Sequence, residues 1–161
     1  MNKTPLEMGL VFAAAIGSGL VGGTFYAFSS FVMAALGRIP PAQGVAAMKG
    51  INVTVINPSF MTVFMGTGGL CLLVGVESLF TWNQAGAKLA LVASLVYLVG
   101  CFGTTVVSNV PLNNQLASMA DPAAAIAFWP HYLEAWTIWN HVRTIAAVSS
   151  AVCFTLVLCR L

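Results

Sequence analysis

The sequence predicts an all-α integral membrane protein built as a bundle of four transmembrane helices. Of its 161 residues, 59% are hydrophobic and 6% are charged, whereas about a quarter of the residues of a soluble protein are charged. The mean hydropathy is +0.92. The apolar residues form four long runs, and a run of about 20 residues crosses the bilayer core as a helix. A net charge of +2 is too small and too scattered for a nucleic-acid surface.

We expect the spans at about residues 8–36, 58–80, 89–110 and 138–160 of a single domain that covers residues 1–161. The first run carries no charge between Glu7 and Arg38, and Pro40-Pro41 ends its helix. Asn57-Pro58 marks the start of the second span, because asparagine caps helices and proline suits a first helical turn. A polar turn at residues 77–88 separates the second span from the third.

The region from Asn109 to Arg143 is the longest connection between two spans. It contains an apolar segment, residues 123–129, which predicts a short helix that lies at the membrane interface before the last span. Pro130 suits a first helical turn. We therefore expect the last helix to begin near Pro130 and to run to the C-terminus.

Small residues recur every four positions along the first span, at Ala15, Gly19, Gly23 and Ala27. Such a stripe lets another helix approach closely. Glycines are also frequent in the second span. These glycine-rich faces predict tight helix contacts, either within one protomer or in a homo-oligomer.

Four spans place both termini on one side of the membrane. Lysine and arginine are equally frequent on the two sides, with Lys3, Lys88 and Arg160 on the terminal side and Arg38, Lys49 and Arg143 on the other. If Arg143 belongs to a site inside the bundle it does not count, and the positive-inside rule then favours cytoplasmic termini. We expect a bacterial-type inner or plasma membrane, with lipids around the bundle.

Polar residues gather at the membrane end opposite the termini. They are Arg38, Asn52, Asn57, Asn109, Asn113, Asn114, Asn140, His141 and Arg143. Polar side chains at membrane depth are costly unless they pair or line a cavity, so this end is the candidate functional site. The alternative is that the asparagines cap helix ends and Arg143 extends to the lipid headgroups.

The segment from Trp136 to Arg143 is the centre of this polar end. Trp136, Asn140 and Arg143 fall at i, i+4 and i+7 and share one helix face. Glu134 and His141 lie on the opposite side of the same helix, with His131 nearby. The helix therefore separates its polar residues into two groups.

Together these side chains have the chemistry to bind and activate a flat aromatic ligand. Histidine titrates near neutral pH, which makes His141 the candidate general base. Arg143 and Asn140 would stabilise an oxyanion or phenolate. Hydrogen bonds to ligand carbonyl or hydroxyl groups would come from Asn52, Asn109 and Asn113. The side chains that would stack on a flat ring are Tyr26, Phe28, Trp136 and Trp139.

A metal site is a competing use of His131, Glu134 and His141. This spacing is not a familiar closed ligand set. A further alternative is a b-type haem held by His131 or His141, although both histidines lie in one segment and axial pairs in bundles come from different helices. We therefore expect no metal or organic cofactor.

Several motifs resemble those of the DUF1772 family of small four-span membrane proteins, which includes anthrone oxygenases. The matching elements are Phe25-Tyr26-Ala27-Phe28-Ser29 with Met33 and Leu36, Met48 with Asn52, Asn109-Val110-Pro111-Leu112-Asn113, and Trp136 through Arg143. The resemblance covers nearly the whole chain. Its most specific parts are the Asn-x-Pro-x-Asn and Trp-Asn-His-x-Arg elements.

The resemblance implies oxidation of an anthrone to an anthraquinone with O₂ and without an added organic cofactor. In that reaction a base removes the acidic benzylic proton, and Arg143 and the asparagines hold the resulting anion. Two other classes of function remain open. One is a non-catalytic module that binds or transports a lipophilic small molecule, and the other is a metal- or haem-dependent redox protein.

Overall fold

The computed structural model describes residues 4–159, and all regular elements in this range are helices. They are α1 (Pro5–Ala27), η1 (Phe28–Val32), α2 (Met33–Leu36), α3 (Pro41–Thr54), α4 (Pro58–Phe80), α5 (Ala87–Leu95), η2 (Val96–Gly103), η3 (Thr105–Asn109), α6 (Val110–Ser118) and α7 (Pro122–Leu158). The segments η1, η2 and η3 are π-helical turns inside longer helices.

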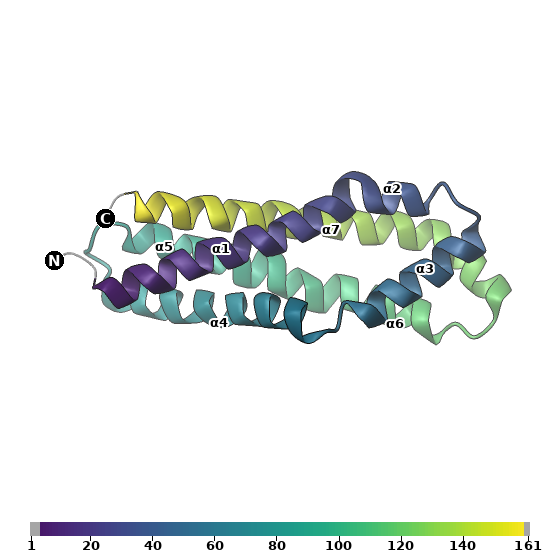
Figure 1. Cartoon of the computed structure of the whole chain (residues 1–161), viewed down its shortest axis with the longest axis horizontal. Coiled ribbons are helices and arrows are strands. Elements are labelled where there is room, and N and C mark those ends of the chain that lie inside the picture. The colour runs from purple at the N-terminus through teal and green to yellow at the C-terminus, as the bar shows by residue number, and fades with distance from the viewer. Residues whose placement is uncertain (1–3, 160–161) are drawn as a thin grey trace.

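Four continuous helices are long and apolar enough to cross a membrane: Pro5–Leu36, Pro58–Phe80, Ala87–Ser118 and Pro122–Leu158. The prediction of an all-α protein with four spans is therefore confirmed. The start of α1 and the end of α7 lie at the same end of the elongated bundle (Figure 1). The side of the membrane on which they lie stays a prediction.

The longest helices are longer than a bilayer requires. At about 1.5 Å per residue, a helix the length of α7 measures about 55 Å, whereas the hydrocarbon core is about 30 Å thick. The excess forms the end of the bundle opposite the termini, where α2, α3, α6 and residues 122–136 of α7 pack together (Figure 1). We call this part the head.

Three of the four long helices begin at a residue whose side chain caps the helix. Thr4 and Glu7 form a reciprocal capping box at the start of α1. The Asn57 side chain accepts a hydrogen bond from the Phe60 N–H at the start of α4, so this asparagine is a cap and not a site residue. Asp121 caps α7 in the same way, through the Ala123 N–H.

The fourth helix begins earlier than expected, at Pro122 and not near Pro130. Residues 123–129 are helical but continuous with α7, so they are not a separate interfacial helix. Pro130 removes one backbone hydrogen bond, yet its neighbours Trp129 and Tyr132 are buried in the head and hold the helix together. The expected end of this span at residue 160 lies outside the described residues.

The third helix also extends further than expected. It continues through α6 to Ser118, so the Asn109–Asn113 motif lies on a helix and not in a loop. Pro111 causes no break because it falls in the first turn of α6. Only residues 119–121 connect α6 to α7.

Two hydrophobic clusters of buried side chains form the interior. One lies among α1, α4, α5, η2 and the C-terminal part of α7, and the other fills the head. Phe25 belongs to the first cluster and Trp136 to the second. The two cores therefore approach each other between these residues.

Within the protomer, the two glycines of the predicted small-residue stripe on α1 do not lie at a helix contact. Gly19 and Gly23 have open space where a Cβ would be, whereas Gly17 and Gly22 face Thr67 and Val148 closely. The contact face is shifted because α1 packs against α4 and α7 at once. Homo-oligomer formation through the exposed glycines stays a prediction.

Gly100 of η2 permits the closest approach to α7. A Cβ at this position would lie 2.7 Å from the Ala146 Cβ, which cannot rotate away. We expect Gly100→Ala to lower the free energy of unfolding by about 1–3 kcal/mol because the helices must separate. Thermal unfolding in detergent measures this effect. Gly66→Ala is the matched control, since nothing lies within 4 Å of its added methyl group; equal melting temperatures for the two variants would contradict the packing.

Candidate functional site

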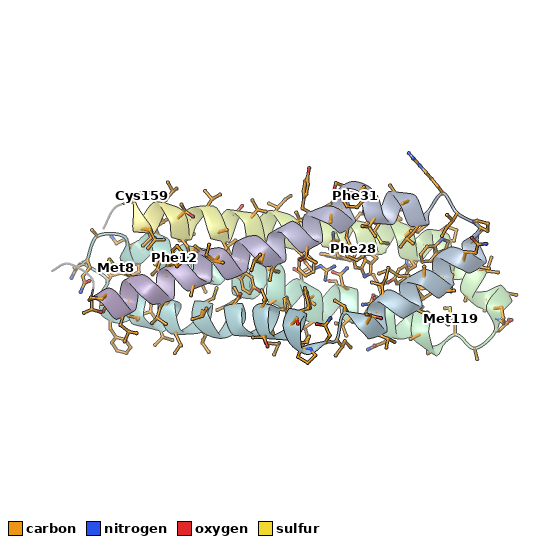
Figure 2. The ribbon with its side chains drawn as sticks, viewed as in Figure 1. Met8, Phe12, Phe28, Phe31, Met119 and Cys159 are labelled. Carbon is orange, nitrogen blue, oxygen red and sulfur yellow. The ribbon has the colours of Figure 1, made fainter. Side chains whose placement is uncertain are left out.

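The candidate site lies on the buried face of α7, where the two hydrophobic cores meet. Trp136, Asn140 and Arg143 are all buried on this face, as their helical spacing predicts. Phe28 packs against Trp136 with ring centroids 5.5 Å apart, and Figure 2 shows Phe28 near the junction between the long bundle and the head.

Arg143 is a cation in an almost dry environment, with 4% of its surface exposed. Its Nη2 donates to the Asn140 Oδ1 at 2.7 Å, and its Nη1 lies 3.5 Å from the Thr105 Oγ1. The guanidinium lies 4.1 Å from the Phe25 ring centroid and 4.9 Å from that of Trp136, at distances typical of cation–π contacts. None of the carboxylates within residues 4–159 pairs with it.

Asn140 orients this guanidinium. The Asn140 Nδ2 donates to the Phe25 carbonyl oxygen and to the Ser29 Oγ, both at 2.7 Å. A carbonyl oxygen only accepts hydrogen bonds, so the amide orientation is determined and the Asn140 Oδ1 must face Arg143. The Ser29 hydroxyl also lies 3.1 Å from that of Thr144. The amide therefore connects α1 and η1 to the cation on α7.

Three polar residues on the third helix face α7, and we call them the polar ladder: Thr105, Asn109 and Asn113. Thr105 contacts Arg143. The Asn109 Nδ2 donates to the Trp136 carbonyl oxygen at 3.1 Å. The Asn113 Oδ1 accepts from the Tyr132 hydroxyl at 2.8 Å and from the Trp136 Nε1 at 2.9 Å. The ladder thus follows α7 over several turns.

Two buried polar atoms in this region have no partner among the described residues: the Arg143 Nε and the Asn109 Oδ1. Most buried polar groups in proteins are hydrogen-bonded, so unpaired ones need an explanation. One is a cationic donor and the other is a neutral acceptor. Chemically, the free donor can hold a ligand oxygen that carries negative charge, and the free acceptor can receive a hydrogen from a ligand hydroxyl.

Asn52 lies at the outer end of this network. Its Nδ2 is 3.4 Å from the Tyr132 hydroxyl, which in turn donates to Asn113. Asn52 therefore reaches the polar ladder only through Tyr132. Its predicted part in substrate binding stays a prediction.

The side chains of His141 and Arg143 point to different sides of α7. His141 is exposed on the other side of α7, where it lines a shallow groove of about 260 Å³ with Tyr26, Ser29 and Thr144. Trp139 is also exposed, at 43% of its surface. Of these groove residues, Ser29 and Thr144 also belong to the Arg143 network, because Ser29 accepts from the Asn140 amide and Thr144 donates to the Asn140 carbonyl oxygen.

The alternative metal ligands are not assembled. His131 and Glu134 are exposed, and within residues 4–159 no three His, Cys, Asp or Glu side chains lie close enough to hold a metal ion. The physical reason is helix length. Ten residues separate His131 from His141, which corresponds to about 15 Å along α7.

Four contributing residues escaped the sequence-based prediction: Phe25, Ser29, Thr105 and Tyr132. Phe25 and Ser29 stood in a recognised aromatic motif, but nothing local showed which of its side chains turn inward. Thr105 precedes Asn109 and Asn113 at intervals of four, a spacing that places residues on one helix face. This spacing would have identified Thr105 if the segment had been predicted as a helix.

A protein-family profile described as "Anthrone oxygenase" matches residues 60–153, which is more than half of the chain. The match includes the polar ladder, Trp136, Asn140 and Arg143, and it excludes α1 and α3. No curated protein and no solved structure matches the chain.

The Asn113 amide oxygen should be important for the stability of the head. Asn113→Ala leaves the Tyr132 hydroxyl and the Trp136 Nε1 without an acceptor, and we expect a loss of about 2 kcal/mol in the free energy of unfolding. Asn114→Ala on the neighbouring exposed position should change it by no more than about 0.5 kcal/mol. Thermal unfolding of the two variants in detergent tests this difference, and similar stabilities would show that the two hydrogen bonds are not important.

Proposed function

Because this chain belongs to the anthrone oxygenase family, we propose that it is a membrane-embedded oxygenase for a flat, lipophilic, anthrone-like or phenolic compound. The observation that supports this best is Arg143, a buried cation without a carboxylate partner among the described residues and with a free N–H. A buried charge without compensation is costly. An anionic reaction intermediate would supply the missing negative charge.

The proposed reaction begins with loss of a proton from the acidic benzylic carbon of the substrate. The electron pair that remains is delocalised onto the ketone oxygen, which becomes an enolate. Arg143 would hold this oxygen, and its attraction is strong because the site excludes water. Asn140 fixes the guanidinium in advance, so little reorganisation is needed as the charge develops.

The electron-rich anion would then react directly with O₂. One oxygen atom of O₂ becomes the new carbonyl oxygen at the benzylic carbon, and the other leaves as water with the two hydrogens of that carbon. Anthrone and O₂ thus give anthraquinone and water. The substrate supplies the electrons, so the balanced reaction requires no organic cofactor.

Aromatic side chains around Arg143 favour a flat, apolar ligand. Phe25 and Trp136 contact the guanidinium, and Phe28 packs on Trp136. Phe64 extends this group, because it stacks on both Phe60 and Phe102. Rings of this kind bind other rings by stacked or edge-to-face contact. The bilayer would deliver such a substrate at high local concentration.

His141 remains the proposed proton acceptor, and its position sets a condition on the mechanism. The imidazole faces the outer groove, whereas the guanidinium faces the interior. Ser29 lies between them, since it lines the groove and bonds to Asn140. The substrate would therefore have to place its acidic carbon toward the groove and its ketone oxygen toward Arg143.

Replacement of Arg143 tests the anion-binding role. We expect Arg143→Met to reduce anthrone-dependent O₂ uptake by about 100-fold or more, because the enolate loses its cation. Arg143→Lys should not restore it, since a lysine cannot contact Asn140 and Thr105 with a planar fork. Arg38→Met is the matched control, because Arg38 is an exposed arginine at the head. Uptake is measured with detergent-purified protein and simple anthrone.

Uptake retained by Arg143→Met would remove the anion-binding role. Saturable binding of anthrone by the wild type without any O₂ uptake would instead identify a binding or transport module. Both outcomes are read with variants that retain a helical circular dichroism spectrum.

Chemical rescue tests the role of His141. His141→Ala should lose most of the O₂ uptake, and added imidazole should restore part of it because the position is open to the outside. His131→Ala, an exposed histidine on the same helix, should keep wild-type uptake and show no response to imidazole. Full activity of His141→Ala without imidazole would remove this histidine from the mechanism.

A further inference from the structure

We propose that Asn109 selects substrates that carry a free phenolic hydroxyl close to the oxygen that Arg143 holds. This inference rests on the proposed function, because it concerns the substrate class of the same site. It follows from the direction in which two unpaired atoms can form hydrogen bonds.

The orientation of the Asn109 amide is determined by its one partner. The Nδ2 donates to the Trp136 carbonyl oxygen, and a carbonyl oxygen only accepts, so the amide cannot be reversed. The Asn109 Oδ1 is therefore left as an acceptor. Asn109 has 1% of its surface exposed, and the Oδ1 has no partner among the residues that the structure describes.

The Arg143 Nε lacks an acceptor, since an arginine N–H only donates hydrogen bonds. Arg143 reaches η3 at Thr105, and Asn109 lies one turn further along η3, where it reaches α7 at Trp136. Trp136 also lies under the guanidinium of Arg143. The free donor and the free acceptor thus belong to the same seam between η3 and α7, beside one tryptophan.

A single ligand satisfies both atoms if it offers an acceptor oxygen and a hydroxyl hydrogen. The ketone or enolate oxygen of an anthrone-like ring would accept from Arg143. A phenolic hydroxyl on the same ring system would donate to the Asn109 Oδ1. A carboxylate ligand would pair with Arg143 but would place its negative charge against the amide oxygen. An unsubstituted or O-methylated ring would leave that oxygen unpaired.

Leaving a buried acceptor unpaired is the basis of strong discrimination between ligands that differ by one hydroxyl group. The wild type should therefore prefer hydroxylated rings, and the preference should depend on Asn109. Asn109→Leu keeps a similar side-chain size but removes the acceptor. Asn114→Leu, on the exposed neighbour of Asn113, is the matched control.

The first experiment measures binding of two non-oxidisable probes, 1,8-dihydroxyanthraquinone and unsubstituted anthraquinone, to the purified protein in lipid nanodiscs. For each variant, the ratio of the two dissociation constants is the readout, because this ratio does not depend on the fraction of folded protein. We expect Asn109→Leu to reduce the preference for the hydroxylated probe by about tenfold or more. Asn114→Leu should leave the preference within about twofold of the wild type.

An unchanged ratio in Asn109→Leu would overturn the proposal and would indicate that a water molecule satisfies the amide oxygen. Failure of both probes to bind the wild type would also overturn it. Reduced preference in a protein that never consumes O₂ would support the selective site and reject the oxygenase function. O₂ uptake that depends on Arg143, together with an unchanged preference in Asn109→Leu, would support the oxygenase function and reject the selective role of Asn109.

Discussion

The burial of Arg143 is the constraint on which the rest of the site depends. A guanidinium that is removed from water loses a large hydration energy, and the usual compensation is a carboxylate partner. Here the compensation comes from the Asn140 amide and the faces of the Phe25 and Trp136 rings, with a longer contact to Thr105. These neighbours hold the cation without neutralising it. The charge therefore has no neutralising partner among the described residues.

Two of the π-helical segments lie beside the Arg143 network. Segment η1 follows Phe25, whose carbonyl oxygen binds Asn140, and η3 carries Thr105 and Asn109. π-helical turns are wider than α-helical ones and often occur at functional sites. The turns thus occur in the two helices that face Arg143, and α7 itself stays regular.

His141 and Arg143 are two positions apart in the sequence, but their side chains lie on different faces of α7. The inner face holds Arg143 and Asn140, and the outer face presents His141 to the groove beside Tyr26. Ser29 and Thr144 both line the groove and both form hydrogen bonds with Asn140. A substrate that enters from the lipid would meet the groove first. Contact with both faces at once then requires a ligand that reaches past Ser29.

The sequence by itself determined the four spans, the start of the second span at Asn57-Pro58, and the shared face of Trp136, Asn140 and Arg143. These features depend on hydrophobic runs and on spacing within one helix, which are local. The tertiary structure alone decided that His141 faces away from Arg143, and that Phe25 and Thr105 complete the cation's surroundings. It also decided the orientation of the Asn109 and Asn140 amides, because each depends on a carbonyl oxygen of another helix. Contacts between helices depend on packing register and on the π-helical turns, and neither is encoded in the periodicity of a single segment.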